Sequence, residues 1–267
     1  MAVKVAIDAT GAGDPLVLLH GLGASRRLWY RVAPLLASDR LVLMPDLPGF
    51  GDSAPAGPGF EFAAVIDALG AVLAERAGGP FDLLGSSLGG AVALEFAAAR
   101  PELVRRLVLA APAGFSPRPG PLADVAGALA EPTLAVRRIA GARLSASATA
   151  RRVLLWGAVA EPERLSAEDA QLIIESSARA RRLGAALAAV LRADLRPQLA
   201  RFEGPVGLIW GERDRVVPFA TLETIRALRA DVVAETIPRA AHIPQLERPG
   251  EFVAAVRRVL SRLDTDS

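Results

Sequence analysis

The sequence predicts an α/β fold, in which a mostly parallel sheet is flanked by helices. Short apolar runs alternate along the chain with longer helical patterns, as in parallel strands joined by crossover helices. Most of these runs are almost entirely apolar, which is expected of strands buried on both faces. The predicted strands cover residues 16–19, 41–44, 81–84, 107–110, 206–210 and 232–237, and the alternating residues 1–8 leave room for one strand before them.

The connections between these strands have helical patterns. Pro101 and the pair Gly78-Gly79 end two of them, as helix breakers do. The strands and helices together account for residues 1–113 and 198–267, which we expect to form the core of one domain. The predicted helices cover residues 31–37, 62–76, 88–100, 219–228 and 249–263.

An insertion at residues 114–197 interrupts this pattern. Pro117, Pro119 and Pro121 open it as a stiff, irregular connection. The remainder is rich in alanine, leucine and arginine and contains no convincing strand. A helical insertion between two strands predicts a lid over the carboxyl edge of the sheet. Its helices are expected near residues 134–140, 148–158 and 167–191.

The composition narrows the functions open to the chain. Its 267 residues are 52% hydrophobic and 22% charged, which is typical of a globular protein. The absence of cysteine excludes disulfides, thiolate metal sites and a cysteine nucleophile, and no metal site is predicted. The N-terminus lacks the features of a signal peptide, and no apolar run approaches the ~18 residues of a membrane span. We therefore expect a cytoplasmic protein with no membrane span.

The charge distribution argues against a nucleic-acid partner. The sequence pI is about 9.8, but the formal net charge is only +2. Arginine pairs such as Arg105-Arg106 and Arg181-Arg182 are scattered among acidic residues and form no stripe. They are interpreted as solvated helix faces.

A glycine-framed serine is the strongest catalytic signal. Gly85-Ser86-Ser87-Leu88-Gly89 matches the pattern G-x-S-x-G between a predicted strand and a predicted helix, which is the context that this turn requires. The glycines are needed because side chains beside so sharp a turn would clash. This frame selects Ser87 as nucleophile over Ser86, since Ser86 would need glycines at positions occupied by leucine. The alternative is an ordinary turn that starts a helix.

A serine needs a base, and the chain offers only two histidines. His242 follows the last predicted strand, where a loop brings it to the same sheet edge as Ser87. His20 follows an early strand, and a structural role in shaping its loop is the preferred interpretation. We therefore predict His242 as the base.

The third catalytic group is a carboxylate that orients the imidazole. Asp214 lies in Gly211-Glu212-Arg213-Asp214, directly after a predicted strand. The order Ser87, Asp214, His242 is the order expected for this kind of sheet. Glu212 is the local competitor, and Asp231 is a surface-loop alternative.

The negative charge that develops on the oxygen of the attacked carbonyl is stabilised by hydrogen-bond donors that are already in place. The backbone N–H of Leu88, which follows the nucleophile, is one candidate. The N–H of Leu22, in the glycine-flanked loop after an early strand, is the other. The alanine and leucine content of the insertion suggests an apolar pocket; Trp210 is more naturally explained by strand packing. Further candidates for the substrate pocket are His20, Gly21, Trp156 and Ile243.

Five ordered motifs together resemble the α/β-hydrolase family, in its lid-bearing branch. The resemblance implies an eight-stranded, mostly parallel sheet, an acyl-enzyme mechanism and no cofactor, and it makes the loop with Asp46 and Asp52 structural. One departure is Arg239-Ala240-Ala241 before the histidine, where a glycine is common. The motifs are His20-Gly21-Leu22-Gly23, Asp46-Leu47-Pro48-Gly49-Phe50-Gly51-Asp52-Ser53, Gly85-Ser86-Ser87-Leu88-Gly89-Gly90, Gly211-Glu212-Arg213-Asp214 and His242.

The resemblance leaves the substrate open. A serine nucleophile disfavours the family members that use aspartate. Meta-cleavage-product hydrolases, which cut carbon–carbon bonds, resemble this layout, but they often carry an aromatic residue where this chain has Ile243 and an asparagine where it has Ser86. These differences favour a serine esterase acting on small to medium apolar esters. For a dienoate substrate, Arg179, Arg181 or Arg182 would have to hold the carboxylate.

A function of a different class is a ligand-binding protein or receptor that keeps the fold with little turnover. The complete set Ser87, Asp214 and His242 argues against it, since inactive relatives usually lose one member. A small-molecule ester is therefore the expected partner, and the oligomeric state is left open.

Overall fold

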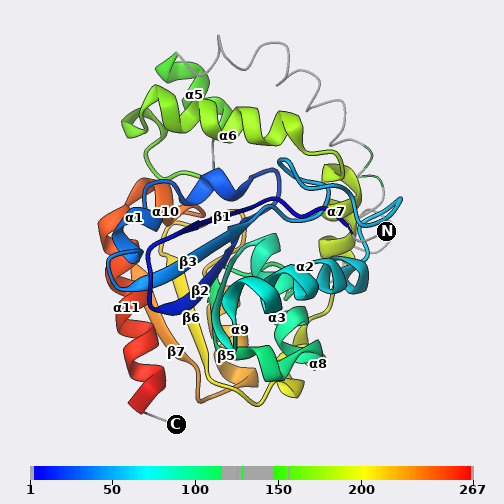
Figure 1. The fold of residues 1–267 in the computed structure, drawn as a ribbon. Coiled ribbons are helices and arrows are strands. Elements are labelled where there is room, and N and C mark those ends of the chain that lie inside the picture. The colour runs from blue at the N-terminus through cyan, green and yellow to red at the C-terminus, as the bar shows by residue number, and fades with distance from the viewer. Residues whose placement is uncertain (1–2, 116–124, 126–127, 129–146, 156, 266–267) are drawn as a thin grey trace.

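The computed structural model describes residues 3–115, 125, 128, 147–155 and 157–265, and in this part of the chain seven strands form one sheet (Figure 1). Their order is β1-β3-β2-β4-β5-β6-β7; β1 pairs with β3 antiparallel and all other pairs are parallel. The strands are β1 (Ile7–Thr10), β2 (Asp14–Leu19), β3 (Arg40–Pro45), β4 (Phe81–Ser86), β5 (Val104–Ala110), β6 (Val206–Gly211) and β7 (Val233–Ile237).

The N-terminal segment explains why the described sheet has seven strands and not the eight that were expected. The one strand predicted before Leu16 is present as β1, but the described residues before it, 3–6, do not form another strand. The N–H of Ala6 donates to Ser53 Oγ at 2.9 Å, and the carbonyl of Lys4 accepts from Ala54 N at 2.9 Å. The backbone of this segment is thus paired with the loop after β3.

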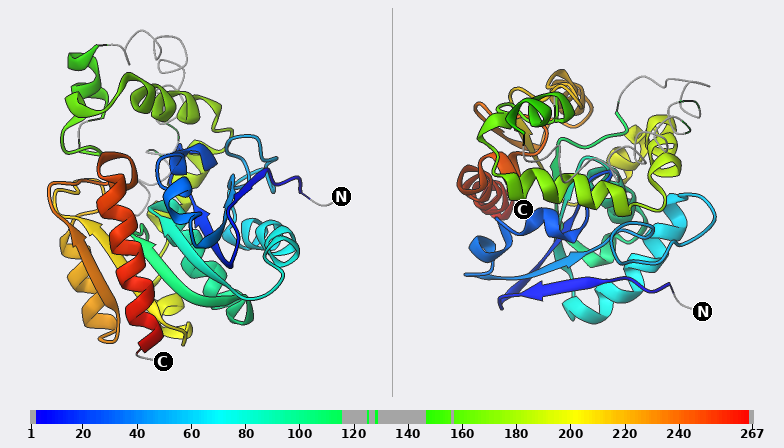
Figure 2. Two further views of the ribbon diagram at one scale, coloured as in Figure 1. Left: turned by 60° about the vertical axis from the view of Figure 1, so that its left-hand side comes forward. Right: turned by 90° about the horizontal axis from the view of Figure 1, so that it is seen from above.

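Helices cover both faces of the sheet (Figure 2). In the described residues α2, α3 and α9 pack on one face and α1 and α11 on the other, and no helix is long and apolar enough to cross a bilayer. The helices of the core are α1 (Ala33–Leu36), α2 (Phe62–Ala77), α3 (Leu88–Ala99), α8 (Arg196–Arg201), α9 (Ala220–Leu228), α10 (Pro244–Glu247) and α11 (Pro249–Thr265), with 3-10 turns η1 (Arg26–Trp29) and η2 (Pro101–Leu103). A third 3-10 turn, η3 (Pro162–Arg164), lies in the insertion.

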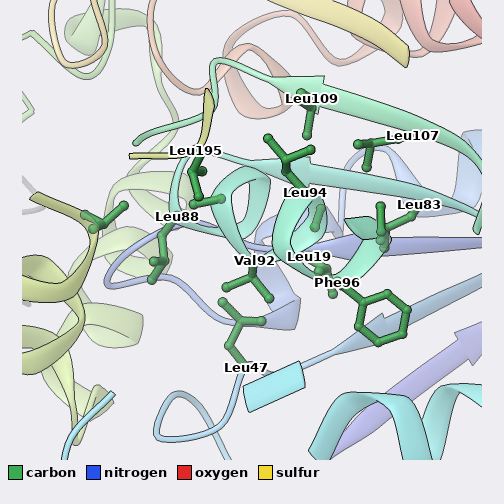
Figure 3. Close-up of a cluster of buried hydrophobic side chains, with 14 of the residues drawn as sticks. Leu19, Leu47, Leu83, Leu88, Val92, Leu94, Phe96, Leu107, Leu109 and Leu195 are labelled. Atoms are coloured by element: carbon green, nitrogen blue, oxygen red, sulfur yellow. The ribbon is translucent and has the colours of Figure 1, made fainter. Parts of the chain in front are cut away.

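The core is fixed by the alternation of apolar side chains along the strands. Leu83 of β4 packs with α3 on one face, while its neighbour Leu84 belongs to the cluster on the α11 face. Figure 3 shows Val92 and Phe96 of α3 beside the strand residues on the first face. The helix that follows Ser87 is therefore anchored over its whole length by buried apolar contacts.

The insertion between β5 and β6 contains α5 (Ala148–Leu154), α6 (Ala167–Arg179) and α7 (Leu183–Arg192), and α5 and α6 lie above the sheet in Figure 1. The helix expected at residues 134–140 lies outside the described residues. The single helix expected over 167–191 is wrong, because it is broken between α6 and α7. At the break, Arg181 N donates to Gly49 O at 2.8 Å and its guanidinium donates to Ser53 O at 2.5 Å.

A cluster of charged side chains lies at the end of the sheet opposite the insertion. The carboxylate of Asp82, at the start of β4, is fully buried and accepts hydrogen bonds from Arg40, Arg105 and Arg106 at 2.5 to 3.2 Å. Arg106 also donates to Leu260 O of α11 at 3.1 Å. The cluster satisfies a buried charge and joins the strands to the C-terminal helix.

Candidate active site

Ser87 occupies a strained turn between β4 and α3. Its φ of 56° and ψ of −117° are unusual for a residue with a side chain. A Cβ on Gly85 would lie 2.2 Å from Gly89 O, and one on Gly89 would lie 2.3 Å from Leu19 O. Both positions must therefore be glycine for the turn to close against β2.

The end of β5 holds the backbone of Ser87 in this conformation. Ser87 N donates to Ala110 O at 3.0 Å, and Ser87 O accepts from Ala113 N at 3.2 Å. The register pairs Ser86 with Ala110, so that the turn begins where the two strands end side by side. Hydrogen bonds from a neighbouring strand offset the cost of the strained conformation, of the order of 1–3 kcal/mol.

His242 and Asp214 are joined by a hydrogen bond. The distance from His242 Nδ1 to Asp214 Oδ2 is 2.8 Å, and both side chains are buried. The second oxygen of Asp214 accepts from the N–H groups of Val216 and Val217 at 2.8 and 3.0 Å. The carboxylate is thus fixed by its own loop, and its contact leaves the Nε2 atom of His242 for another partner.

Neighbouring strand ends bring these loops together. Gly211 of β6 is paired with Ile237 of β7, so the loops carrying Asp214 and His242 start side by side. A Cβ on Gly211 would lie 2.1 Å from Ala241 O, so this glycine permits the close approach of the two loops.

Ser87 and His242 line one cavity of about 250 Å³. Of the described residues in its wall, none is charged, and the polar side chains besides Ser87 and His242 are those of Ser86 and Ser176. The remaining lining is Gly21, Leu22, Gly23, Ala24, Leu28, Leu155, Ala158, Leu172, Ile173, Val216 and Ile243. Two of the four pocket candidates, Gly21 and Ile243, are therefore in the wall, as is the predicted oxyanion donor Leu22.

The two predicted oxyanion donors lie at this cavity or beside it. Leu22 is the second residue of a turn closed by Ala24 N donating to Gly21 O at 3.2 Å, and its own N–H is not used by that bond. Leu88 begins α3, where the first N–H groups have no partner within the helix. A Cβ on Gly21 would lie 3.3 Å from Ser87 Cβ, so the Leu22 loop passes close to the serine.

His20 is buried beneath this loop and is not among the residues that line the cavity. Its Nε2 accepts from Leu47 N at 3.0 Å, so the proton is on Nδ1, which donates to Gly21 O at 2.9 Å. Burial lowers the pKa of His20, and the Gly21 carbonyl and Asp46 oppose this shift. The arrangement fits the structural role preferred from sequence and not that of a pocket residue.

The other candidates that the structure describes are not among the residues of the cavity wall. Trp156 lies outside the described residues, and the buried indole of Trp210 donates to Val217 O at 3.2 Å. Arg181 binds the Ser53 carbonyl, and Arg182 donates to Gly57 O at 3.2 Å. Arg179 lines a different, much smaller cavity.

The two alternatives to Asp214 lie elsewhere. Glu212 is exposed, and Asp231 is exposed and paired with Arg229 at 3.0 Å. The partner of His242 Nδ1 is Asp214. In the described residues no group of three or more His, Asp or Glu side chains could hold a metal ion.

Three residues near the site were not predicted from the sequence to lie there. Ser176 lies in the cavity wall, with its hydroxyl 3.1 Å from that of Ser25. Gln245 is fully buried, and its Nε2 lies 3.4 Å from Ser86 Oγ. Leu28 reaches the wall from η1. The helical spacing of Leu172 and Ser176 was the one available signal, because it predicts that both lie on one face of α6.

A serine on a strand-to-helix turn that shares an apolar cavity with a His–Asp pair is the arrangement of α/β-fold hydrolases that act through a nucleophile. The chain belongs to the Alpha/beta hydrolase family, whose sequence profile matches residues 16–256. This finding confirms the family that the motifs resemble.

Individual relatives are consistent with this family assignment. The chain is 33% identical over 254 residues to the pimeloyl-[acyl-carrier protein] methyl ester esterase of Chromobacterium violaceum, covering 94% of this chain and 95% of that one. It is similar to the solved structure of a thermophilic esterase from Thermogutta terrifontis, with a TM-score of 0.77, 26% identity and coverage of 98% and 94%. The 2-hydroxymuconate semialdehyde hydrolase of a Pseudomonas strain is 39% identical over 118 residues, 43% of this chain and 42% of that one. These likenesses confirm a hydrolytic enzyme of the esterase type and leave its ester undefined.

Proposed function

We propose that the chain is a serine esterase that cleaves small to medium apolar carboxylic esters through an acyl-enzyme. The observation that carries this proposal is the cavity itself, in which Ser87 and His242 lie in a wall without a charged side chain among its described residues. Such a wall suits a neutral acyl or alcohol group and disfavours an ion, because burying an unpaired charge is costly.

The mechanism follows from the contacts. The Oγ of Ser87 attacks the ester carbonyl while its proton passes to His242 Nε2, the nitrogen not bound to Asp214. Asp214 stabilises the imidazolium, and the N–H groups of Leu22 and Leu88 receive the oxyanion. His242 then gives the proton to the leaving alcohol. Water, deprotonated by His242, releases the acid from Ser87.

The domain organisation belongs to the same proposal. Residues 1–113 and 198–267 form the hydrolase core, and residues 114–197 act as a lid whose helices complete the cavity. Leu155, Leu172, Ile173 and Ser176 of the insertion contribute to the wall. A methyl ester of a straight acyl chain, as in the name of the Chromobacterium relative, has the neutral, apolar character that this wall favours.

A matched pair of substrates tests the proposal. The neutral ester p-nitrophenyl butyrate and its acid counterpart p-nitrophenyl hemisuccinate have acyl chains of similar length. We expect kcat/KM to be about 100-fold higher for the butyrate, since the carboxylate finds no cation in the wall. Ser87→Ala should abolish both activities. Undiminished turnover by Ser87→Ala, or equal turnover of the two esters, would contradict the proposal.

Carbon–carbon hydrolysis of a dienoate is the second candidate, favoured by the partial likeness to the 2-hydroxymuconate semialdehyde hydrolase. It needs a cation for the carboxylate, but Arg181 and Arg182 are bound to backbone carbonyls outside the cavity wall. Turnover of a meta-cleavage dienoate far above that of any ester would establish this candidate. Stoichiometric labelling by a fluorophosphonate without turnover of either substrate would instead support the ligand-binding alternative.

A further inference from the structure

Glu247, at the end of α10, joins the catalytic histidine loop to the insertion. Its Oε1 accepts from Ala241 N at 2.9 Å, and its Oε2 accepts from Ala160 N at 2.8 Å. Ala241 directly precedes His242, whereas Ala160 lies in the segment between α5 and η3. One carboxylate therefore satisfies backbone donors of two segments that are 81 residues apart in the sequence.

The backbone of His242 is part of the same junction. Its N–H donates to Ala158 O at 3.1 Å, and Ala158 and Ile243 both lie in the cavity wall. On the other side, Arg213 N donates to Ala240 O at 2.9 Å. The histidine loop is thus held between the Asp214 loop of the core and the segment around Ala158 of the insertion.

A carboxylate suits this junction better than any neutral side chain. It offers an acceptor oxygen to each of the two N–H groups, whereas an amide offers one oxygen and would turn an NH2 group toward the other donor. Burial raises the pKa of Glu247, while the backbone donors and Arg248 oppose the shift. The backbone donors of Glu247 include Ile243 as well as Ala241, so the carboxylate is bound to the backbone on both sides of His242. Its influence on the reaction would run through that backbone.

We propose that Glu247 is a positioning residue, which sets the place of His242 by tying Ala241 to Ala160 of the insertion. The proposal rests on the proposed function in one respect, namely that His242 is the base for Ser87. It adds that the insertion, besides forming the wall of the cavity, helps to place the base.

A purely structural tether is the competing explanation, and the chain offers a matched control for it. Glu161, next to Ala160, pairs with Arg248, next to Glu247, at 3.5 Å between Oε2 and Nη2. This ion pair joins the same two segments through side chains and does not involve the Ala241 N–H that Glu247 binds. Glu161→Gln therefore weakens the attachment of the insertion and leaves the Ala241 contact in place.

The experiment compares Glu247→Gln, Glu161→Gln and the unchanged protein, each as the full chain. The second-order rate constant for labelling of Ser87 by a fluorophosphonate reports the base directly, and p-nitrophenyl butyrate gives kcat and KM. For Glu247→Gln we expect labelling to reach completion, but with a rate constant about tenfold lower than that of the unchanged protein. We expect kcat to fall about tenfold and KM to change by no more than about twofold, since a small displacement of a catalytic group lowers the rate of reaction. Glu161→Gln should stay within about twofold throughout.

Two results would overturn the proposal: rate constants of Glu247→Gln within about twofold of the unchanged protein, or an equal loss in Glu161→Gln. If Glu247→Gln does not fold, Glu247→Asp decides, because it keeps the charge but withdraws the oxygens by about 1.5 Å. Its labelling should also be slowed, and an unchanged rate would refute the role. Labelling of Ser87 without hydrolysis of any ester would end the esterase proposal, while the labelling rates would still decide on Glu247.

Discussion

Asp214 and His242 form the best-defined pair in the site, with Oδ2 and Nδ1 at 2.8 Å and the other carboxylate oxygen held by two backbone donors. The backbone donors fix the carboxylate independently of the histidine. Asp214 is therefore held in place to fix one tautomer of His242, as the proposed role of His242 as base requires.

The first prediction concerns Asp214→Asn. The amide oxygen can keep the contacts to Val216 and Val217, so the fold should persist with a similar Tm. The amide NH2 would then face Nδ1 and favour the wrong tautomer of His242, and we expect kcat to fall about 10³- to 10⁴-fold. Steady-state kinetics with p-nitrophenyl butyrate measure the loss. The exposed Glu212→Gln is the control, and a comparable loss there would contradict the assignment of Asp214.

The second prediction concerns the turn at Ser87. Gly89→Ala places a Cβ 2.3 Å from Leu19 O, a backbone atom that cannot move aside, so the free energy of unfolding should fall by about 1–3 kcal/mol or more. At Gly79 a Cβ meets nothing within 4 Å. Gly79→Ala should therefore stay within about 1 kcal/mol of the unchanged protein. Urea unfolding compares the two variants, and equal stabilities would show that the turn tolerates a side chain.

The third prediction concerns the attachment of α6. Asp169 is fully buried, accepts from Tyr30 and Arg31 of the core at 2.6 Å each, and closes a capping box with Ser166. Asp169→Ala removes the cap and both contacts to the core, at a cost of about 1–3 kcal/mol. Amide hydrogen exchange should therefore accelerate in α6 and remain unchanged in α11.

The exposed neighbour Glu168 provides the control for that experiment. Glu168→Ala should leave the exchange of α6 nearly unchanged, since it removes no contact to the core. If Asp169→Ala also left it unchanged, α6 would be held by its apolar face alone.

The fourth prediction concerns the dependence of stability on pH. Burial lowers the pKa of His20 below 6.5, so the unfolded chain binds a proton at a pH where the folded protein does not. This contribution to stability is complete above pH 6.5 and is lost as the pH falls below it, by up to about 1.4 kcal/mol per pH unit. Urea unfolding from pH 7 to 5 should show a shallower dependence for His20→Gln than for the unchanged protein. Parallel curves would show that His20 titrates normally.

Much of the fold could be predicted from the sequence because parallel strands leave a strong local signal. All six apolar runs are strands, and the turn at Ser87 follows from glycine spacing. The single helix over 167–191 was wrong, and the eighth strand that the family resemblance implies is not present in the described residues, whereas the one strand expected before Leu16 is. Both differences have the same cause. Residues 4–6 and Arg181 both form hydrogen bonds with the loop after β3, and such contacts leave no periodic pattern in the sequence.

For the candidate site too, some features could be predicted from the sequence and others could not. The placement of Ser87, Asp214 and His242 near one another follows from strand order, and their catalytic roles stay predictions. Ser176 and Glu247 depend on how the insertion packs on the core, which periodicity does not encode. Glu247 had no signal beyond an acidic residue in an apolar stretch after the histidine.

The cluster around Asp82 has a consequence for substitutions in the wall of the cavity. Asp82 and Ser87 stand at opposite ends of β4, five residues or about 16 Å apart. The ionic contacts that join the strands to α11 therefore lie away from the loops and the insertion that shape the cavity. A substitution in the wall of the cavity can therefore change the shape of the cavity without removing the contacts around Asp82.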